Sequence, residues 1–429
     1  MKQPKSLTIA EKLKSIRESK GIMQPALAEA IDGTVSKISE IENGKRQYTD
    51  EEIGIIKRLL DVDDAPLDDE DVAKFKNRLY ALRDFISDRR TDEADKLQIE
   101  LAVIAKLPYE IELNALYELF KVRRLLINEG SDNIALSKNI LEPMELSIEQ
   151  ATNEIKYHFY CNKGLLKILE GDNAQAAKLY STAVSIEAVG FEKDPKVYYN
   201  LALCYSRMGM AVRSIIILMK SYNNFSNHDM TNTFRLHLDN LIAVNYIRTN
   251  QIESAIEVLN QVYERASSLN DKTFIGIALY NIGVAQYRLR GYEKAIEHFD
   301  RTFEYITKDD GLYLDVMYMK IRCLIVLVKA TYKPLLLQAQ TLAENNKHHS
   351  LLFESLEHTL SLKEKSSIKF IESKTIPYLI ERRNYCEALR YCDTLINAFT
   401  KNDSKTKILE TKALKAEILS KILYGGECG

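Results

Sequence analysis

An asparagine inside an apolar helical pattern recurs in this chain at intervals of 38, 40 and 41 residues, and this repeat restricts the possible folds more than any other pattern in the sequence. In each copy a helix is followed by a short polar turn and a second helix, and nothing after about residue 108 looks like a strand. One such helix pair cannot bury its apolar face alone, so successive copies must stack. The sequence therefore predicts an all-α repeat domain. The recurring residues are Asn162, Asn200, Asn240 and Asn281.

The second helix of each copy begins with a small residue and carries a bulky residue four positions later. This spacing resembles the tetratricopeptide pattern, whose usual period is ~34 residues. The resemblance implies a right-handed superhelix of helix pairs over residues 108–429, with further copies near 114–141, Tyr313–Lys329 and Asn384–Leu389. The small–bulky pairs are Ala176 with Tyr180, Ser214 with Leu218, Ala255 with Leu259, and Ala295 with Phe299.

Short helical patterns divided by turn signals occupy the N-terminal part of the chain. We assign residues 1–66 to a helix-turn-helix domain and residues 67–107 to a linker helix region, with an acidic stretch over 63–71 between them. The expected elements are a helix with Ile9, Leu13 and Ile16 on one face, helices over about 24–31 and 34–42, turns at Asp32-Gly33 and Asn43-Gly44, and a capping box from Thr49 to Glu52.

The two short helices carry the residues of a known DNA-binding motif. The run Gln24–Ile31 with its Leu-Ala pair, and the run Thr34–Arg46 with its Ile-Ser and Glu-Asn-Gly-Lys-Arg end, closely resemble the phage-repressor (XRE) type of helix-turn-helix. That family lays its third helix in the major groove. The resemblance implies base-edge contacts from Val35, Ser36, Ser39 and Glu40, and phosphate contacts from Gln24, Lys37, Asn43, Lys45 and Arg46.

Charge alone does not identify the partner of this N-terminal motif. Residues 1–48 hold 9 Lys/Arg and 6 Asp/Glu, a net of +3, and the whole chain has a formal net charge of −2. Any nucleic-acid contact must therefore come from a local patch. Double-stranded operator DNA is the expected partner, because the polar face of the third helix and the Lys45-Arg46 end would otherwise have no use. A helix-turn-helix that serves protein contacts is the competing interpretation.

The recurring asparagines predict a peptide site. In tetratricopeptide folds their position points into the concave groove, and an amide both donates and accepts hydrogen bonds. A ladder formed by these four asparagines would hold an extended peptide by its backbone. Arg207 and Arg288 lie seven residues beyond Asn200 and Asn281, on the same helix face, where they could meet a peptide carboxylate. For a single asparagine, bridging two helices is an equal alternative, and a solvated basic face is the alternative for the arginines.

The combination of helix-turn-helix, linker helix and repeat array resembles the peptide-pheromone-responsive quorum-sensing regulators of Gram-positive bacteria, the RRNPP family. The resemblance implies a cytoplasmic homodimer whose DNA binding changes when it binds a short signalling peptide. The C-terminal repeats, about residues 370–424 with Leu379, Leu389, Leu395 and Leu414, are expected to form the symmetric contact. Two other functions stay open, namely Rap-like sequestration or dephosphorylation of a response regulator through residues 72–180, and a plain scaffold.

Other motifs are missing from the sequence. It contains no P-loop, H-E-x-x-H or nucleophile elbow, so we expect no enzyme, cofactor or metal site. The six cysteines form no C-x-x-C pair and are expected to be reduced, packed thiols. His348-His349 is interpreted as part of a solvated polar turn. The apolar run Cys323–Val328 is too short to span a bilayer, and the N-terminus lacks a signal-peptide pattern.

Overall fold

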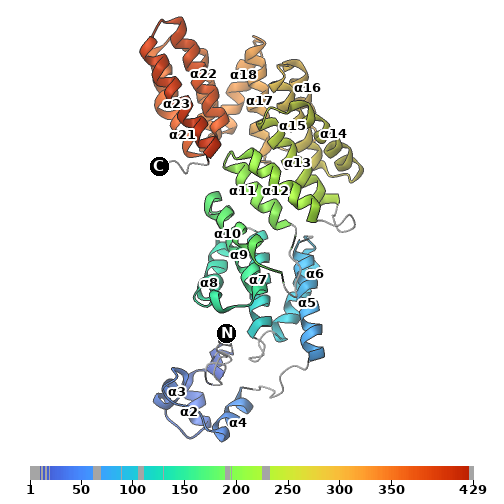
Figure 1. Ribbon diagram of the computed structural model, residues 1–429, viewed down its shortest axis with the longest axis vertical. Coiled ribbons are helices and arrows are strands. Elements are labelled where there is room, and N and C mark those ends of the chain that lie inside the picture. Colours follow the sequence, from blue (N-terminus) through green and yellow to red (C-terminus); the bar gives the residue numbers. More distant parts are fainter. Residues whose placement is uncertain are drawn as a thin grey trace. The chain divides into compact units, whose positions relative to one another are not determined.

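A computed structural model shows the chain as α-helices joined by short turns (Figure 1). No strand occurs in the part of the chain that it describes, which confirms the all-α prediction. The chain divides into two compact units, Met1–Lys193 and Asp194–Gly429. The described residues are 20–60, 69–87, 89–104, 111–128, 130–188, 194, 196–224 and 232–424, together with Ala10, Leu13, Lys14, Arg17 and Glu18.

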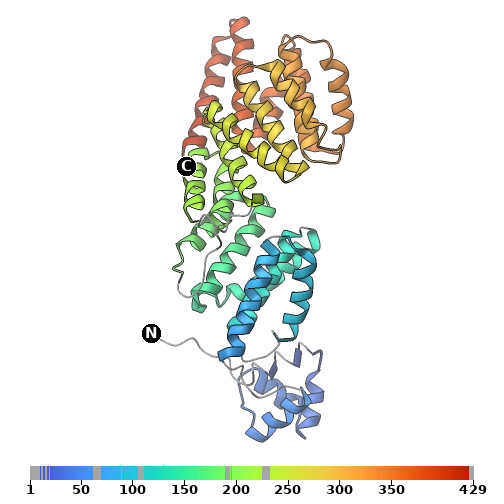
Figure 2. The same cartoon turned by 90° about the vertical axis from the view of Figure 1, so that its right-hand side faces the viewer.

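The first unit begins with a small bundle around its own apolar core (dark blue in Figures 1 and 2). Its helices are α2 (Gln24–Ala30), α3 (Val35–Glu42) and α4 (Asp50–Leu59). Thr49 and Glu52 form the capping box that the sequence predicts at the start of α4. Of the predicted first helix, Leu13 lies in the core, whereas Ile9 and Ile16 lie outside the described residues.

The two predicted turns of the bundle are confirmed by the backbone. Asp32 (φ 48°) and Gly44 (φ 72°) adopt the left-handed conformation just after α2 and α3. Glycine and, less readily, aspartate and asparagine tolerate this conformation, so both turn dipeptides end their helices for a steric reason. Thr34 then starts α3 by accepting a hydrogen bond from the backbone N–H of Lys37.

The rest of the first unit packs around a second core. The segment expected to be a linker contributes Phe75, Leu79 and Leu101 to this core, which it shares with the helices that follow. Residues 69–104 are therefore part of the packed unit, while most of the acidic stretch lies outside the described residues. The helices are α5 (Asp69–Ser87), α6 (Thr91–Ile104), α7 (Ile111–Ile127), α8 (Ser131–Glu145), α9 (Asn153–Leu169) and α10 (Asn173–Ser185), with a 3₁₀ turn at Ile148–Gln150.

The second unit consists of further antiparallel helix pairs. Between α20 and α21 the chain passes through a π-helical turn at Ile371–Thr375. The pairs are α11 (Lys196–Arg207) with α12 (Ala211–Asn224), α13 (Asn232–Arg248) with α14 (Ile252–Ser268), α15 (Lys272–Arg288) with α16 (Tyr292–Thr302), α17 (Leu312–Val326) with α18 (Tyr332–Leu342), α19 (Lys347–Leu360) with α20 (Lys365–Phe370) and α21 (Ile376–Glu381), and α22 (Tyr385–Lys401) with α23 (Lys405–Tyr424).

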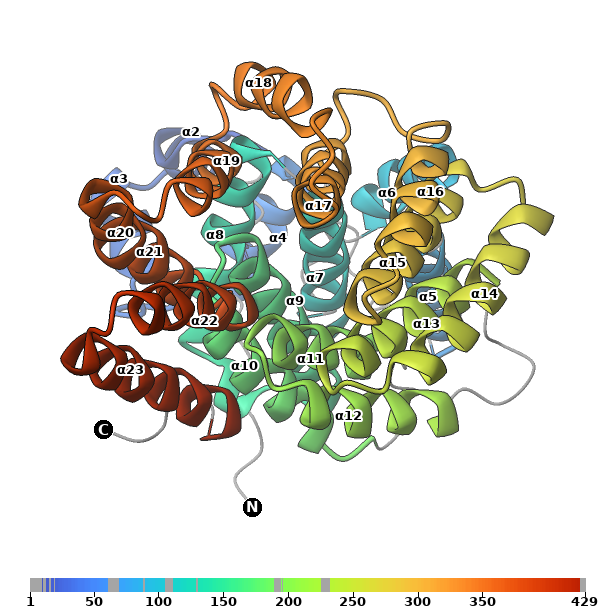
Figure 3. The ribbon, with the colours of Figure 1, turned by 90° about the horizontal axis from the view of Figure 1, so that it is seen from above.

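Within the second unit the pairs follow one another around a ring. Figure 3 shows α13 and α15 on the inner side, with α12, α14 and α16 on the outer side. The ring closes where α22 begins, because a Cβ built on Gly209, in the turn between α11 and α12, would lie 3.2 Å from the Tyr385 ring. The stacked helix pairs of the second unit thus have the superhelical, tetratricopeptide-like fold expected from the repeat.

The small–bulky pairs pack as the sequence predicts, since all eight of their residues are buried and the four bulky ones have no exposed surface. The structure adds a partner on the first helix of each pair. Where the bulky residue is aromatic, the facing residue is glycine: a Cβ on Gly283 would lie 2.5 Å from Phe299, and one on Gly164 would lie 2.9 Å from Tyr180. Where it is leucine, the facing residue is an alanine of the same core cluster, Ala202 or Ala243.

The structure shows where the cysteines, His348-His349 and the C-terminal leucines lie. Among the five cysteines that the structure describes, four are buried as expected and Cys386 is exposed. Burial raises the pKa of the Cys204 thiol to about 12. The polar turn predicted around His348-His349 is wrong, because both residues belong to α19 and buried His349 contacts Asp315 at 3.0 Å. Leu379 and Leu395, expected in a dimer contact, lie fully or almost fully buried in the unit's own core.

No helix in the described part of the chain is long and apolar enough to cross a membrane.

Candidate functional site

The outer face of α3 carries the side chains expected to meet base edges. Val35 is 43% exposed, and Ser36 and Glu40 are exposed as well. Ser39 is half-buried, while Ile38 on the opposite face is fully buried in the bundle. This division follows from helix periodicity, because exposed Ser36 and Glu40 lie four positions apart and buried Ile38 and Ile41 lie three apart, with Val35 at the edge of the exposed face. The polar face of α3 is therefore accessible to a partner.

The turn after α3 presents two accessible cations. Lys45 and Arg46 are exposed, and neither forms an ion pair or a side-chain hydrogen bond with the residues that the structure describes. Asn43 is exposed too, and its Nδ2 donates to Ser39 Oγ at 3.4 Å. Accessible cations without an internal partner are the groups best able to bind phosphates, because no existing ion pair has to be broken.

Two residues expected to contact phosphates have partners inside the bundle. Lys37 Nζ pairs with the carboxylate of Glu52, and this hydrogen bond lowers the pKa of the Glu52 carboxyl. Gln24 Nε2 donates to Glu42 Oε2 at 2.8 Å. A phosphate would have to compete with these carboxylates. The two cations that follow α3 are consequently the stronger candidates for phosphate contacts.

A buried ion pair holds the bundle together behind the α3 face. Arg17 Nε donates to Glu42 Oε1 at 2.6 Å and its Nη2 donates to Oε2 at 2.8 Å. The two side chains are only 7% and 1% exposed. Burial opposes ionisation of Glu42, but hydrogen bonds from Arg17 and Gln24 outweigh this effect and lower the pKa of the carboxyl. The end of α3 is thus fixed by a charge pair that water scarcely reaches.

A residue with positive φ in the turn within each pair gives the repeats a common register. The small residue of the second helix follows it by five positions in every copy. Asn162, Asn200 and Asn281 precede it by nine positions, but Asn240 precedes it by ten. One position is a rotation of about 100° around the helix axis, so Asn240 is not equivalent to the other three. The residues of positive φ, which serve as the reference residue of each turn, are Gly171, Gly209, Asn250 and Arg290.

Two of the asparagines bridge neighbouring first helices. Asn162 is 3% exposed, and its Nδ2 donates to the carbonyl of Leu119 on α7 at 2.6 Å. Asn281 is 9% exposed, and its Nδ2 donates to Oδ1 of Asn240 on α13 at 2.8 Å. Bridging was the alternative kept open for a single asparagine. Asn162 is a packing residue in this structure, since its amide is committed to the backbone of α7 and is not available to a peptide.

Asn200 and Asn240 keep amide groups that are available to a ligand. Both are half-buried. Asn281 fixes the orientation of the Asn240 amide, whose Nδ2 makes no hydrogen bond with the described residues. The Asn200 side chain makes none either within the described part of the chain. A half-buried amide with unused donors is well suited to bind an extended backbone.

Arginines recur two positions before the reference residue of the turn. Arg207 and Arg288 are exposed, and neither forms an ion pair or a side-chain hydrogen bond with the described residues. Arg248 occupies the same position on α13, which the sequence alignment missed because its register was off by one. Its Nη1 donates to Ser206 Oγ at 2.6 Å. Arg207 and Arg288 are thus solvated, and Arg248 is packed against a neighbouring helix, while their contact with a peptide carboxylate stays a prediction.

The structure also brings together a polar cluster, Tyr287, Tyr318, Arg322, Glu387 and Arg390, that sequence reasoning missed. Arg322 on α17 donates from Nη1 to Glu387 Oε1 at 2.8 Å and from Nη2 to the Tyr287 hydroxyl at 3.1 Å. Arg390 donates from Nε to Glu387 Oε2 at 2.8 Å and from Nη2 to the Tyr318 hydroxyl at 2.9 Å. The cluster therefore joins α15 and α17 to α22.

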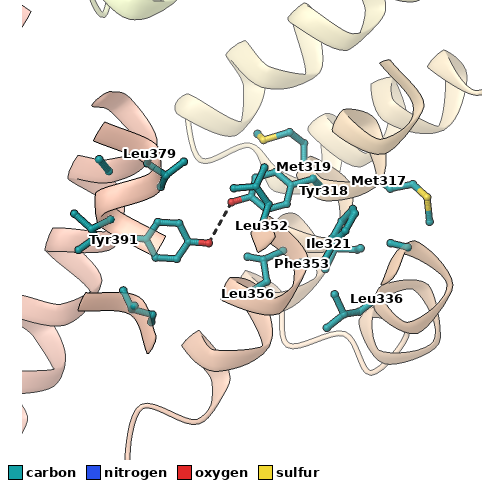
Figure 4. Packing of buried hydrophobic residues seen from close by; sticks show 14 of the residues in the cluster. Met317, Tyr318, Met319, Ile321, Leu336, Leu352, Phe353, Leu356, Leu379 and Tyr391 are labelled. Atoms are coloured by element: carbon teal, nitrogen blue, oxygen red, sulfur yellow. Dashed lines mark hydrogen bonds between the residues drawn. The ribbon is translucent and has the colours of Figure 1, made fainter. Parts of the chain in front are cut away.

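Electrostatics inside this cluster favour the charged forms. Burial opposes ionisation of Glu387, but Arg322 and Arg390 outweigh it and lower the pKa of the carboxyl to about 2. Figure 4 shows the Tyr391 hydroxyl of α22 pointing at that of Tyr318 on α17, 3.5 Å away.

One feature of the sequence indicates this buried cluster. Arg322 lies between the apolar residues Ile321 and Cys323 and directly before the apolar run Cys323–Val328, and a buried cation in such a place needs a partner.

A small cavity lies in the first unit, between α5, α6 and α7. It encloses about 180 Å³. Ligand pockets in proteins usually measure roughly 300–1,000 Å³, so we assign no ligand to it. Its lining combines apolar and basic residues: Phe85, Ile86, Arg89, Thr91, Ala94, Arg124, Ile127 and Asn128.

Comparison with known proteins identifies relatives of the chain. No family model matches it. It is 28% identical over 240 residues to response regulator aspartate phosphatase I of Bacillus subtilis, covering 51% of this chain and 59% of that protein. It is 23% identical over 231 residues to regulatory protein RapD of the same organism, covering 52% and 63%. The chain spans between 44% and 63% of the curated relatives that it matches.

Solved structures share the fold. A Rap protein complexed with competence and sporulation factor superposes with a TM-score of 0.68 at 15% identity, covering 82% of this chain and 99% of that one. The apo quorum sensor NprR from B. thuringiensis gives 0.68 at 18%, covering 81% and 99%. NprR in complex with its cognate peptide NprX gives 0.59 at 18%, covering 78% and 100%. These matches show that the chain has the helical-repeat fold of these proteins.

Proposed function

We propose that this relative of the Rap proteins is a peptide-responsive regulator. A short signalling peptide binds along the first helices of the second unit, and the N-terminal bundle binds operator DNA as a homodimer. The observation that carries the peptide proposal is the pairing of Asn240 with Asn281, which orients one half-buried amide and leaves its donors free. Support comes from the solved structure of NprR, which has this fold and is complexed with a peptide.

Replacing Asn240 with alanine is expected to weaken peptide binding. Each lost hydrogen bond costs about 0.5–1.5 kcal/mol, which is roughly a two- to tenfold change in dissociation constant. Asn281→Ala should act in the same direction, because it removes the group that orients Asn240. Isothermal titration calorimetry with short synthetic peptides encoded beside this gene measures the effect.

The control for the peptide experiment is Asn402→Ala, which removes an exposed amide at the end of α22. It should leave the affinity unchanged. If Asn240→Ala and Asn281→Ala bind the peptide as tightly as this control does, the two asparagines form only a packing contact and the proposed site is elsewhere.

The DNA part of the proposal rests on the exposed face of α3 and the two cations that follow it. Serine can pair with several bases, valine can contact a thymine methyl, and glutamate can accept a hydrogen bond from cytosine. Repressors of this type read paired half-sites, which requires two copies of the bundle. A homodimer therefore accompanies the DNA proposal, with its contact on residues other than Leu379 and Leu395.

Substitutions on the two parts of this surface are expected to have different effects on DNA binding. Ser36→Ala with Ser39→Ala should relax base preference, by ~1–3 kcal/mol for each lost contact. Lys45→Gln with Arg46→Gln should weaken binding to every sequence and flatten its salt dependence. Gel-shift titration against genomic fragments that co-purify with the protein, at several salt concentrations, separates the two effects. Unaltered DNA binding in both double variants would assign the bundle to protein contacts.

A second candidate function is action on a response regulator through residues 72–180. The names of the curated relatives support it, since three of them are response regulator aspartate phosphatases. Passage of phosphorylated response regulators over the immobilised chain discriminates the two proposals. Retention of a regulator and loss of its phosphoryl group would favour this candidate, and retention of operator DNA alone would favour the first.

A further inference from the structure

The polar cluster between α17 and α22 carries more positive than negative charge. Arg322, Arg390 and Glu387 have side chains that are 6%, 25% and 20% exposed. Glu387 is the only carboxylate that forms an ion pair with either arginine in the described part of the chain. One positive charge is therefore not neutralised by an ion-pair partner. A buried charge that lacks a partner is costly, so such a site favours an anion.

The cluster also has unused hydrogen-bond donors that a ligand can reach. A guanidinium carries five N–H groups, and the hydrogen bonds of Arg390 leave its Nη1 without a partner among the described residues. Arg390 stacks on the Tyr391 ring, with its Cζ 4.0 Å from the ring centroid, which holds the guanidinium plane in place. A quarter of the Arg390 side chain remains exposed. The Arg390 guanidinium is thus held in one orientation, and part of it stays accessible to solvent.

We propose that Arg390 and Arg322 form a subsite for a carboxylate of the bound peptide, either its C-terminus or an acidic side chain. This inference rests on the proposed peptide-binding function. Glu387 acts as an internal counter-ion that holds both guanidinium groups in place and competes with the incoming carboxylate. Exposed Arg207 and Arg288 bind a carboxylate more weakly, because their charges are solvated.

Two peptide mixtures test this subsite with the full-length chain. Both contain synthetic hexapeptides of the same random composition, one with free C-terminal carboxylates and the other with amidated C-termini. The immobilised protein is exposed to each mixture, and the retained peptides are identified and quantified by mass spectrometry. If the C-terminus fills the subsite, retention from the free-acid mixture should exceed that from the amidated mixture roughly tenfold. If an acidic side chain fills it, both mixtures yield peptides enriched in Asp or Glu at one position.

Three variants connect the preference to this cluster. Arg390→Gln should abolish the preference for a carboxylate, whereas Glu387→Gln should strengthen it several-fold by removing the competing counter-ion. A gain of binding cannot result from unfolding, so the second variant keeps the test valid if the first folds poorly. The matched control is Arg301→Gln, since Arg301 also contacts a tyrosine, donating to the Tyr263 hydroxyl at 3.0 Å on an exposed surface. It should behave like the wild type.

The possible outcomes separate the two proposals. Equal retention from both mixtures, with no enrichment of acidic residues, would overturn the carboxylate subsite and leave peptide binding intact. The same holds if Glu387→Gln is folded like the wild type by circular dichroism and still retains peptide, but shows no stronger preference for a carboxylate. Retention of no peptide from either mixture would count against the proposed function itself, and the subsite would fall with it.

Discussion

Replacing Glu42 with glutamine is expected to unfold the N-terminal bundle and to abolish its binding to DNA. The change removes the buried counter-charge of the Arg17 guanidinium and leaves it only the exposed carboxylate of Glu18, and breaking a buried pair in this way costs about 3–5 kcal/mol. A bundle of this size has little stability to spare. Hydrogen exchange measured by mass spectrometry should show loss of protection over residues 24–60, while α13–α16 keep theirs. DNA binding should disappear in parallel.

The matched control for this variant is Glu18→Gln. Glu18 contacts the same guanidinium, with its Oε1 3.2 Å from Arg17 Nη2, but its side chain is 56% exposed. Exposed ion pairs contribute roughly 0–1 kcal/mol, so this variant should keep a folded bundle. Equal protection of residues 24–60 in the two variants would mean that the Arg17–Glu42 pair does not hold the bundle together.

The same pair makes the bundle sensitive to acid. The pKa of Glu42 in the folded chain lies below its ordinary value of 4.5, because the hydrogen bonds from Arg17 and Gln24 outweigh the effect of burial. A depressed folded pKa contributes stability that is present above the unfolded pKa and is lost as pH falls through the folded value. Protection of residues 24–60 should therefore be constant near neutral pH and should decline below the ordinary pKa of the carboxyl.

Replacing Phe299 with alanine is expected to destabilise the second unit by about 3–5 kcal/mol, the usual cost of removing a buried phenylalanine. The ring is completely buried and lies against Gly283 on the preceding helix. Gly283→Ala should destabilise by about 1–3 kcal/mol for the opposite reason, because its Cβ would lie 2.5 Å from the Phe299 ring. Urea unfolding followed by circular dichroism measures both.

A double variant tests whether these two residues are matched to each other. Gly283→Ala combined with Phe299→Leu recreates the alanine–leucine pair that the α11–α12 and α13–α14 copies already contain. The alanine should then cost much less than it does opposite phenylalanine, so the two substitutions should be strongly non-additive. Additive effects in the double-mutant cycle would show that Gly283 and Phe299 are not matched to each other. Gly311→Ala, where a new Cβ meets nothing within 4 Å, serves as control.

Local features of this chain were predictable because their causes lie within a few residues. The capping box at Thr49 and the turn at Gly44 depend on neighbours one to three positions away. The small–bulky pairs, such as Ala295 with Phe299, lie four positions apart on one helix face. Helical period and turn chemistry act at this range, and so the all-α repeat fold could be predicted without coordinates.

Features that involve two helices were predicted less well, because register is a property of the pair. Asn240 lies one position further from its turn than the other three asparagines do, so it is not equivalent to them. Its amide nevertheless pairs with that of Asn281. The identity of the residue opposite each bulky side chain, glycine or alanine, was likewise visible only after the helices were packed.

The helical repeat, the order of the helices and the polar face of α3 could be predicted from the amino-acid sequence, since they depend on periodicity and on nearby residues. Which polar groups are free and which are engaged in internal contacts became visible only in the folded chain. Arg322 and Glu387 are 65 positions apart, and no local pattern links them. Burial then makes pairing obligatory, because a charge removed from water must find a partner elsewhere in the fold. The same requirement committed Gln24 and Asn162 to internal contacts and left Lys45, Arg46 and Asn240 with groups available to a ligand.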